Sequence, residues 1–102
     1  MTSSDEAALR DRWRELVEQR LPRAARERTD WPVSLDHCFA RILLDNACGR
    51  PWREVVRPPA WRWMPVSDLA AALALGEAAL AGRVELSELN RRSLQLRGKL
   101  PR

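Results

Sequence analysis

Residues 31–49, with the sequence WPVSLDHCFARILLDNACG, constrain the fold of this chain more than any other stretch. Ser34 is a good N-cap for a helix over residues 35–48, and Gly49 suits the position just past its end. Because successive helical residues are about 100° apart, one face carries Leu35, Phe39, Ile42, Leu43 and Asn46. Further apolar residues fall on the opposite side. We therefore expect this helix to lie near the centre of its domain.

Polar side chains on such a helix are candidates for a site. His37, the only histidine, shares the second face with Arg41 and Asp45, and these three could form a general base with an anion clamp. His37 and Asp45 are two turns apart and form no dyad by themselves, so Arg41 and Asp45 are interpreted as an i,i+4 ion pair. A solvated or internally paired face is the structural alternative. Asn46 interrupts the apolar face, and we expect it to hold a neighbouring loop backbone, because a buried amide needs partners.

The cysteines and the termini of the chain indicate its surroundings. Cys38 and Cys48 are ten residues apart on one predicted helix, about 15 Å, so they cannot bond to each other. Free thiols suit a reducing cytoplasm, and Cys38 is expected to be an inert, partly buried residue. No CxxC or HxxxH spacing occurs, so we expect no metal and no cofactor. A signal-peptide pattern and a long apolar run are both lacking, so a membrane location is not expected.

The flanking sequences predict more helices. In residues 1–30, Ser3 and Glu6 have the spacing of a capping box, and Pro22 either stops the first helix or starts its continuation. The apolar stripe of this helix is Leu9, Trp13, Leu16, Val17 and Leu21. In residues 66–102, Ser67 is expected to cap an alanine-rich helix that ends at Gly82 and packs closely on a neighbour, and a last helix covers residues 86–97.

The length and the periodicity together define the fold class. No stretch alternates with period two, so no sheet is predicted, and 102 residues suffice for one core. We predict a compact all-α bundle of four to five short helices with an irregular Trp/Pro-rich segment. Its single domain, residues 1–102, comprises an N-terminal helix with a charged connector (1–30), the central helix with the irregular segment (31–65) and a C-terminal helical hairpin with a basic tail (66–102).

Positive charge is concentrated in two places. The net charge is +4, and 17 of the 18 basic residues are arginine, which a GC-rich genome alone could explain. Residues 1–30 are neutral, whereas residues 49–65 carry four arginines against Glu54, and residues 89–102 carry five bases and no acid. This balance permits an anionic partner without demanding one.

We call residues 49–65 the Trp/Arg segment. Pro51 suits the start of a short helix through Val56, which Pro58-Pro59 would stop. The segment interleaves Arg50, Arg53, Arg57 and Arg62 with Trp52, Trp61 and Trp63. Alternating guanidinium groups and flat rings suit unpaired nucleic acid, with Arg62 pointing away from both neighbouring indoles if the chain is extended. Alternatively, the tryptophans simply cover the small core.

The basic tail, residues 89–102, is the other candidate for phosphate contact. Arg91, Arg92, Arg97 and Lys99 are expected to form an exposed edge, although cations at a helix C-terminus also complement its dipole. The short connection before this helix is compatible with a helix-turn-helix motif and with many other helical hairpins.

The preferred function is a non-enzymatic nucleic-acid-binding module in which arginines contact phosphates and a tryptophan stacks on a base. One alternative is a protein-interaction subunit, because tryptophan and arginine are enriched in binding hot spots. Another is a small enzyme or ligand-binding domain with His37, Arg41 and Asp45 in a pocket closed by Trp31 or Trp52. The partner is thus nucleic acid or another protein.

Overall fold

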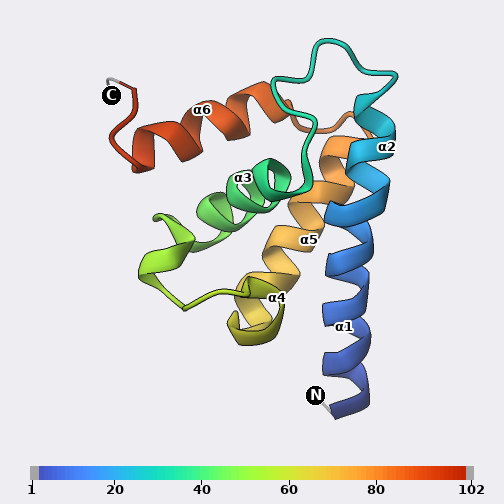
Figure 1. Ribbon diagram of the computed structural model, residues 1–102, viewed down its shortest axis with the longest axis vertical. Helices are drawn as coiled ribbons and strands as arrows, with labels where there is room; N and C mark the ends of the chain where they lie inside the picture. Colours follow the sequence, from blue (N-terminus) through green and yellow to red (C-terminus); the bar gives the residue numbers. More distant parts are fainter. Residues whose placement is uncertain (1–2, 101–102) are drawn as a thin grey trace.

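The computed structural model of the chain describes residues 3–100, which form a helical bundle (Figure 1). The helices are α1 (Ser3–Glu15), α2 (Leu21–Ala25), α3 (Asp36–Cys48), α4 (Ala60–Trp63), α5 (Val66–Leu80) and α6 (Leu86–Leu96). A π-helical stretch, Leu16–Arg20, joins α1 to α2, and a 3-10 turn, Trp52–Glu54, follows α3. No strand occurs in the described range, and the radius of gyration is 13.0 Å, close to the value of about 13 Å expected for a compact chain of 100 residues. The predicted all-α bundle is confirmed.

α1, the π-helical stretch and α2 form one continuous rod along the side of the bundle (Figure 1). Pro22 lies in the first turn of α2, so the predicted continuation, and not a stop, is what forms. The side chain of Ser3 lies outside the described part of the chain, so the predicted capping box lies outside it too. The predicted apolar stripe is buried at every position: Leu9, Trp13, Leu16, Val17 and Leu21.

α3 is the central helix, as predicted. It contacts α5, α6, the rod and the 3-10 turn, and Phe39, Ile42, Leu43, Leu44 and Asp45 are buried along it. Gly49 adopts the left-handed backbone expected past its end, with φ of 72°. The predicted Ser34 cap is wrong, because Leu35 occupies the N-cap position with extended backbone and no side-chain bond. Asp36 instead accepts the His37 amide at 2.8 Å, and Leu35 is exposed and does not join the apolar face.

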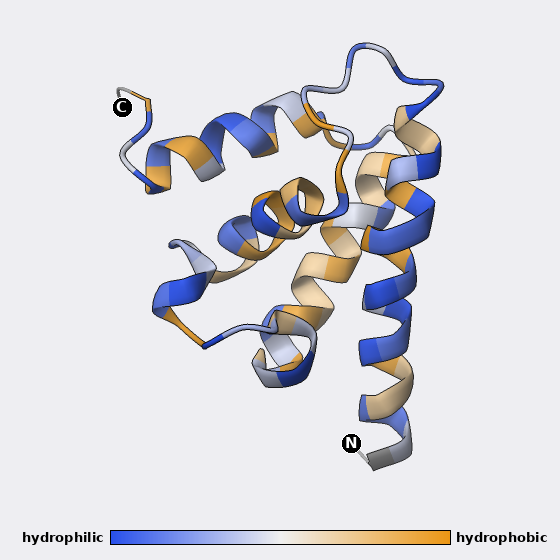
Figure 2. Ribbon diagram, viewed as in Figure 1, coloured by the Kyte–Doolittle hydropathy of each residue, from blue (hydrophilic) through white to orange (hydrophobic). Residues whose placement is uncertain are grey.

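α5 is apolar along most of its length and passes between the rod and α3 (Figure 2). Gly76 makes this approach possible, since a Cβ there would lie 3.1 Å from Leu43 Cδ1 and 3.3 Å from Leu16 Cγ. The predicted close packing through small residues is therefore confirmed. The predicted Ser67 cap is wrong by position, because α5 already begins at Val66, after the extended Pro65.

An ion pair between Arg20 and Glu77 joins the rod to α5. Both Arg20 Nη atoms donate to the Glu77 carboxylate, one of them at 3.0 Å to Oε2, and this hydrogen bonding lowers the pKa of Glu77. A carboxylate with a lowered folded-state pKa contributes stability above its unfolded pKa, and that contribution is lost as the pH falls through the folded value.

We expect Glu77→Gln to lower the free energy of unfolding by about 0.5–1 kcal/mol at pH 7, the range for a partly exposed pair. The difference from the parent should disappear in the acid range, because the parent's Glu77 is then protonated. Urea denaturation between pH 7 and pH 2.5 measures both effects. Glu18→Gln is the matched control, since among residues 3–100 Glu18 forms an ion pair only with Arg14 of the same rod, at 3.1 Å. A parent–variant difference that is constant with pH would contradict this role.

Candidate functional site

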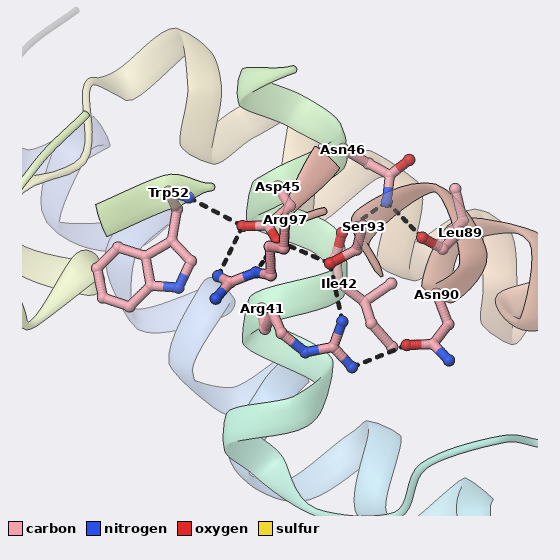
Figure 3. A network of polar contacts seen from close by, with 9 residues as sticks. All are labelled: Arg41, Ile42, Asp45, Asn46, Trp52, Leu89, Asn90, Ser93 and Arg97. Atoms are coloured by element: carbon pink, nitrogen blue, oxygen red, sulfur yellow. Dashed lines mark hydrogen bonds and ion pairs between the residues drawn. The ribbon is translucent and has the colours of Figure 1, made fainter. Parts of the chain in front are cut away.

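A fully buried carboxylate, Asp45, lies where three parts of the chain meet (Figure 3). Its Oδ1 accepts the backbone N–H of Trp52 at 2.9 Å, and its Oδ2 accepts the Ser93 hydroxyl at 2.7 Å. Arg97 completes the shell, with Nε 2.6 Å from Oδ2 and Nη2 3.1 Å from Oδ1. Asp45 thus joins α3 to the Trp/Arg segment and to the end of α6.

The predicted ion pair between Arg41 and Asp45 is wrong. Arg41 Nη1 donates to Ser93 Oγ and Nη2 to Asn90 Oδ1, both at 2.8 Å, so its partners are neutral groups of α6 (Figure 3). Asp45 turns into the protein toward Arg97, 52 residues away in sequence, where two further donors, the Trp52 N–H and the Ser93 hydroxyl, converge on it. The network therefore contains two guanidinium groups and one carboxylate.

Asn46 also differs from its prediction in the identity of its partner. Its Nδ2 donates to the carbonyl of Ile42 at 2.7 Å and to that of Leu89 at 2.8 Å (Figure 3). The second carbonyl belongs to helix α6 and not to a loop. Asn46 thus satisfies its amide, as a partly buried polar group must, and fixes α6 on α3.

His37 does not approach Asp45. Its side chain is 74% exposed, and its Nδ1 lies 3.6 Å from the Asp36 carboxylate. The predicted triple of His37, Arg41 and Asp45 is therefore not brought together in one hollow. His37 and Arg41 do share an open hollow, which Asp45 does not line. We call it the basic hollow, and its lining is His37, Ala40, Arg41, Trp52, Arg53 and Arg97.

Of the two tryptophans expected to close this pocket, only Trp52 does so. Trp31 instead packs edge-on against Phe39, with ring centroids 5.7 Å apart, and lies beneath the Arg28 guanidinium. The involvement of Trp52 and Arg97 has no local sequence signal, because neither is near His37 or Arg41 along the chain. The only indication of this site in the sequence was that basic residues occur close to a tryptophan along the chain.

The Trp/Arg segment is anchored at both ends. Trp52 begins its 3-10 turn, which is shorter than the helix predicted through Val56. At the other end, Arg10 Nη1 donates to the backbone carbonyls of Trp61 and Met64, at 2.9 and 3.0 Å, and ties α4 to α1. Trp52 and Trp61 are half-buried against the core, as the alternative of a covering role predicts.

Trp63 is the most exposed indole of this segment, at 40%. The extended conformation expected around Arg62 is wrong, because residues 60–63 form α4. Helical backbone brings Arg62 back toward its neighbour, so its guanidinium lies 5.0 Å from the Trp63 ring centroid, and that of Arg57 lies 4.0 Å away. Two cations and one flat ring therefore share one exposed cluster.

Most of the predicted phosphate contacts are exposed and lack a counter-charge. Within residues 3–100, no ion pair is formed by any of Arg50, Arg53, Arg57, Arg62, Arg91, Arg92 and Lys99, all exposed. Arg97 is the exception and corrects the prediction of a basic edge, because it is half-buried and paired with Asp45. Arg91 and Arg92 line a separate hollow on α6 that also includes Glu88.

The two cysteines are free thiols on α3. Burial, with a smaller contribution from the charge of Asp68, raises the pKa of Cys48 to about 11, and its Sγ lies 3.7 Å from Met64 Sδ. At pH 8 only about one Cys48 in a thousand is then a thiolate, the reactive form.

We expect a Cys38→Ser variant, in which Cys48 is the remaining thiol, to react slowly with Ellman's reagent at pH 8. In 6 M urea the same thiol should react at least tenfold faster, because its pKa returns toward about 8.5. The absorbance change at equal reagent concentration measures both rates. Free cysteine in the same two solutions corrects for the effect of urea on the reagent, and equal corrected rates would contradict the burial of this thiol.

Comparison with known proteins gives no match to a family, to a curated protein or to a solved structure. The class that the fold defines is a small all-α bundle, and no helix within residues 3–100 is long and apolar enough to span a membrane. The exposed cations of the Trp/Arg segment and the basic tail, together with Trp63, are therefore the basis for a proposed function.

Proposed function

We propose that this chain is a nucleic-acid-binding module that contacts phosphates through the exposed cations of the Trp/Arg segment and the basic tail. The observation that carries the proposal is that seven cations of these two segments are exposed and form no ion pair within residues 3–100. Arginine suits this task because its planar fork can give a phosphate two parallel hydrogen bonds. Asp45 fixes the two basic segments relative to each other, which favours a defined surface over independent charges.

An exposed indole supports a preference for unpaired strands. Trp63 carries the guanidinium groups of Arg57 and Arg62 over its ring, and this exposed cluster of flat groups offers a base a stacking surface in a positive environment. Base–aromatic stacking is available to every base but requires the base to be unstacked, and this condition is met in single strands. The proposed module therefore binds single strands more tightly than duplex of equal length.

Fluorescence anisotropy with labelled single-stranded and duplex oligonucleotides tests the proposal. We expect binding at low salt that weakens as salt rises, because each phosphate contact releases counterions. The triple variant Arg91→Gln, Arg92→Gln, Lys99→Gln should have a shallower salt slope, by about 0.7 for each lost contact on a single strand. Arg97 is left unchanged, because its pairing with Asp45 would confound affinity with stability.

A second triple variant on the rod provides the matched control. Arg12→Gln, Arg23→Gln and Arg26→Gln remove the same charge from exposed positions of the rod, which lie outside both basic segments in the sequence. Their salt slope should remain that of the parent. Equal decreases in the salt slope of the two triple variants would mean that binding depends on net charge alone. Failure of the parent to bind either strand form at low salt would reject the proposed function.

A protein-interaction subunit is the second candidate. Val55 and Trp63 are exposed large apolar residues of the same segment as the arginines, and tryptophan and arginine are enriched in binding hot spots. Sedimentation analysis over a range of concentrations tests for self-association. Self-association that Trp63→Ser abolishes, in a protein that binds no oligonucleotide, would favour this candidate.

A further inference from the structure

Two hollows of different character meet at Trp52. The basic hollow lies on one side of this residue. The second hollow, between α1 and α4, is mainly apolar, and we call it the apolar hollow; its lining includes Trp13, Val17, Trp52, Pro58, Pro59 and Trp61. Both hollows are lined by His37, Ala40, Trp52 and Arg53, so they adjoin across these shared residues.

The polar network behind the basic hollow contains more positive than negative charge. Arg97 is matched by Asp45, but Arg41 has only the neutral Ser93 and Asn90 as described partners. A partly buried cation without a counter-charge is costly, and an anion in the hollow would offset that cost. Each guanidinium carries five N–H donors, and the described bonds use two of those of Arg41, so donors remain for a ligand.

The orientation of a ligand follows from the charged groups around the two hollows. Glu18 and Asp36 line only the apolar hollow, where Arg14 is already paired with Glu18, whereas Arg41 and Arg97 line only the basic hollow. A phosphate therefore suits the basic hollow better. The same carboxylates could accept hydrogen bonds from the amino group of a base. Flat apolar surfaces from Trp52, Trp61 and the Pro58-Pro59 pair suit a planar ring.

We infer that the adjoining hollows are a subsite for one unpaired nucleotide. Its phosphate lies in the basic hollow against Arg41 and Arg53, and its base lies in the apolar hollow against Trp52 and Trp61. This inference rests on the proposed function and deepens it, because it gives one nucleotide of the bound strand a defined place. The remaining exposed cations then contact the phosphates on either side without distinguishing them.

Titration with adenosine monophosphate, adenosine and inorganic phosphate, followed by the indole N–H signals in NMR spectra, tests the subsite. We expect the nucleotide to bind at least tenfold more tightly than either fragment, and to shift the signals of Trp52 and Trp61. Arg41→Gln should weaken nucleotide binding by about 10- to 100-fold, the range for lost hydrogen bonds to a charged group. Binding of adenosine should change little.

Arg53→Gln is the second variant, because Arg41 also bonds α6 and its loss could disturb folding. Arg53 is exposed, forms no ion pair within residues 3–100 and lies 5.4 Å from the Trp52 ring centroid, so its replacement leaves the bonds between α3 and α6 intact. We expect a loss of about tenfold in affinity for the nucleotide. Arg23→Gln on the rod is the charge-matched control and should bind as the parent does.

Three results would separate the subsite from the proposed function. Nucleotide affinity no higher than that of the fragments, or unchanged in both Arg41→Gln and Arg53→Gln, would overturn the subsite. If oligonucleotides still bound, the proposed function would stand without it. Nucleotide binding that requires Arg41 and Arg53, in a protein that binds no oligonucleotide, would support the subsite and reject the module.

Discussion

Replacement of Asp45 by alanine is expected to lower the free energy of unfolding by about 3–5 kcal/mol, the range for removing one partner of a buried ion pair. The carboxylate is fully buried and accepts from Trp52, Ser93 and Arg97. Its loss leaves Arg97 without a counter-charge and leaves the network with two guanidinium groups and no anion. Urea denaturation followed by circular dichroism measures the change.

A double-mutant cycle makes this expectation sharper. If the cost comes from an unmatched charge, Asp45→Ala combined with Arg97→Ala should cost less than the sum of the single variants by about 1–3 kcal/mol. Asp11→Ala, at an exposed position of the rod, is the control and should stay within about 0.5 kcal/mol of the parent. Additive losses at positions 45 and 97 would argue against direct coupling.

The second large effect is expected at Gly76, where α5 meets both the rod and α3. Gly76→Val should lower the free energy of unfolding by about 2–3 kcal/mol, because added methyl groups overpack a well-filled core. Leu16 and Leu43, the first neighbours that a new Cβ would meet, are fully buried and have little room to move. For a domain of this size, the loss corresponds to a decrease in melting temperature of roughly 10–20 °C.

Ala74→Val separates packing from helix propensity. Ala74 lies on the exposed side of the same helix, so valine there carries the usual cost of a β-branched residue without steric conflict. Calorimetry should show a small decrease in melting temperature for Ala74→Val and a large decrease for Gly76→Val. Similar decreases would mean that the core around Gly76 adapts to the larger side chain.

The helices could be predicted because their apolar residues repeat at helical spacing, a local property of the sequence. The stripe from Leu9 to Leu21 and the glycine after α3 are examples, and the structure confirms both. The starts of α3 and α5 were misplaced by one or two residues. Ser34 and Ser67 were predicted as caps because serine is a common N-cap residue. The N-cap positions are instead Leu35 and Pro65, whose backbone is not helical.

The polar partners could not be predicted, because they lie far apart in sequence. Arg41 and Asp45 were predicted to pair because they are four residues apart on one helix. Asp45 instead binds Ser93 of α6 and Arg97 just past its end, about 50 positions away. Burial decides between these partners, since a carboxylate turned into the core must find its donors there. The residue types of the candidate site were visible in the sequence, but their grouping around Trp52 was not.

Arg10 holds α4 in place through backbone atoms and not through the side chains that α4 exposes. Arg10 bonds two main-chain carbonyls, groups that every amino acid supplies, so this tether is indifferent to the side chains at positions 62 and 63. Those two side chains are exposed and can be exchanged without loss of the tether. Such an arrangement is evolvable, because the exposed side chains at Arg62 and Trp63 can vary while the backbone that carries them stays attached.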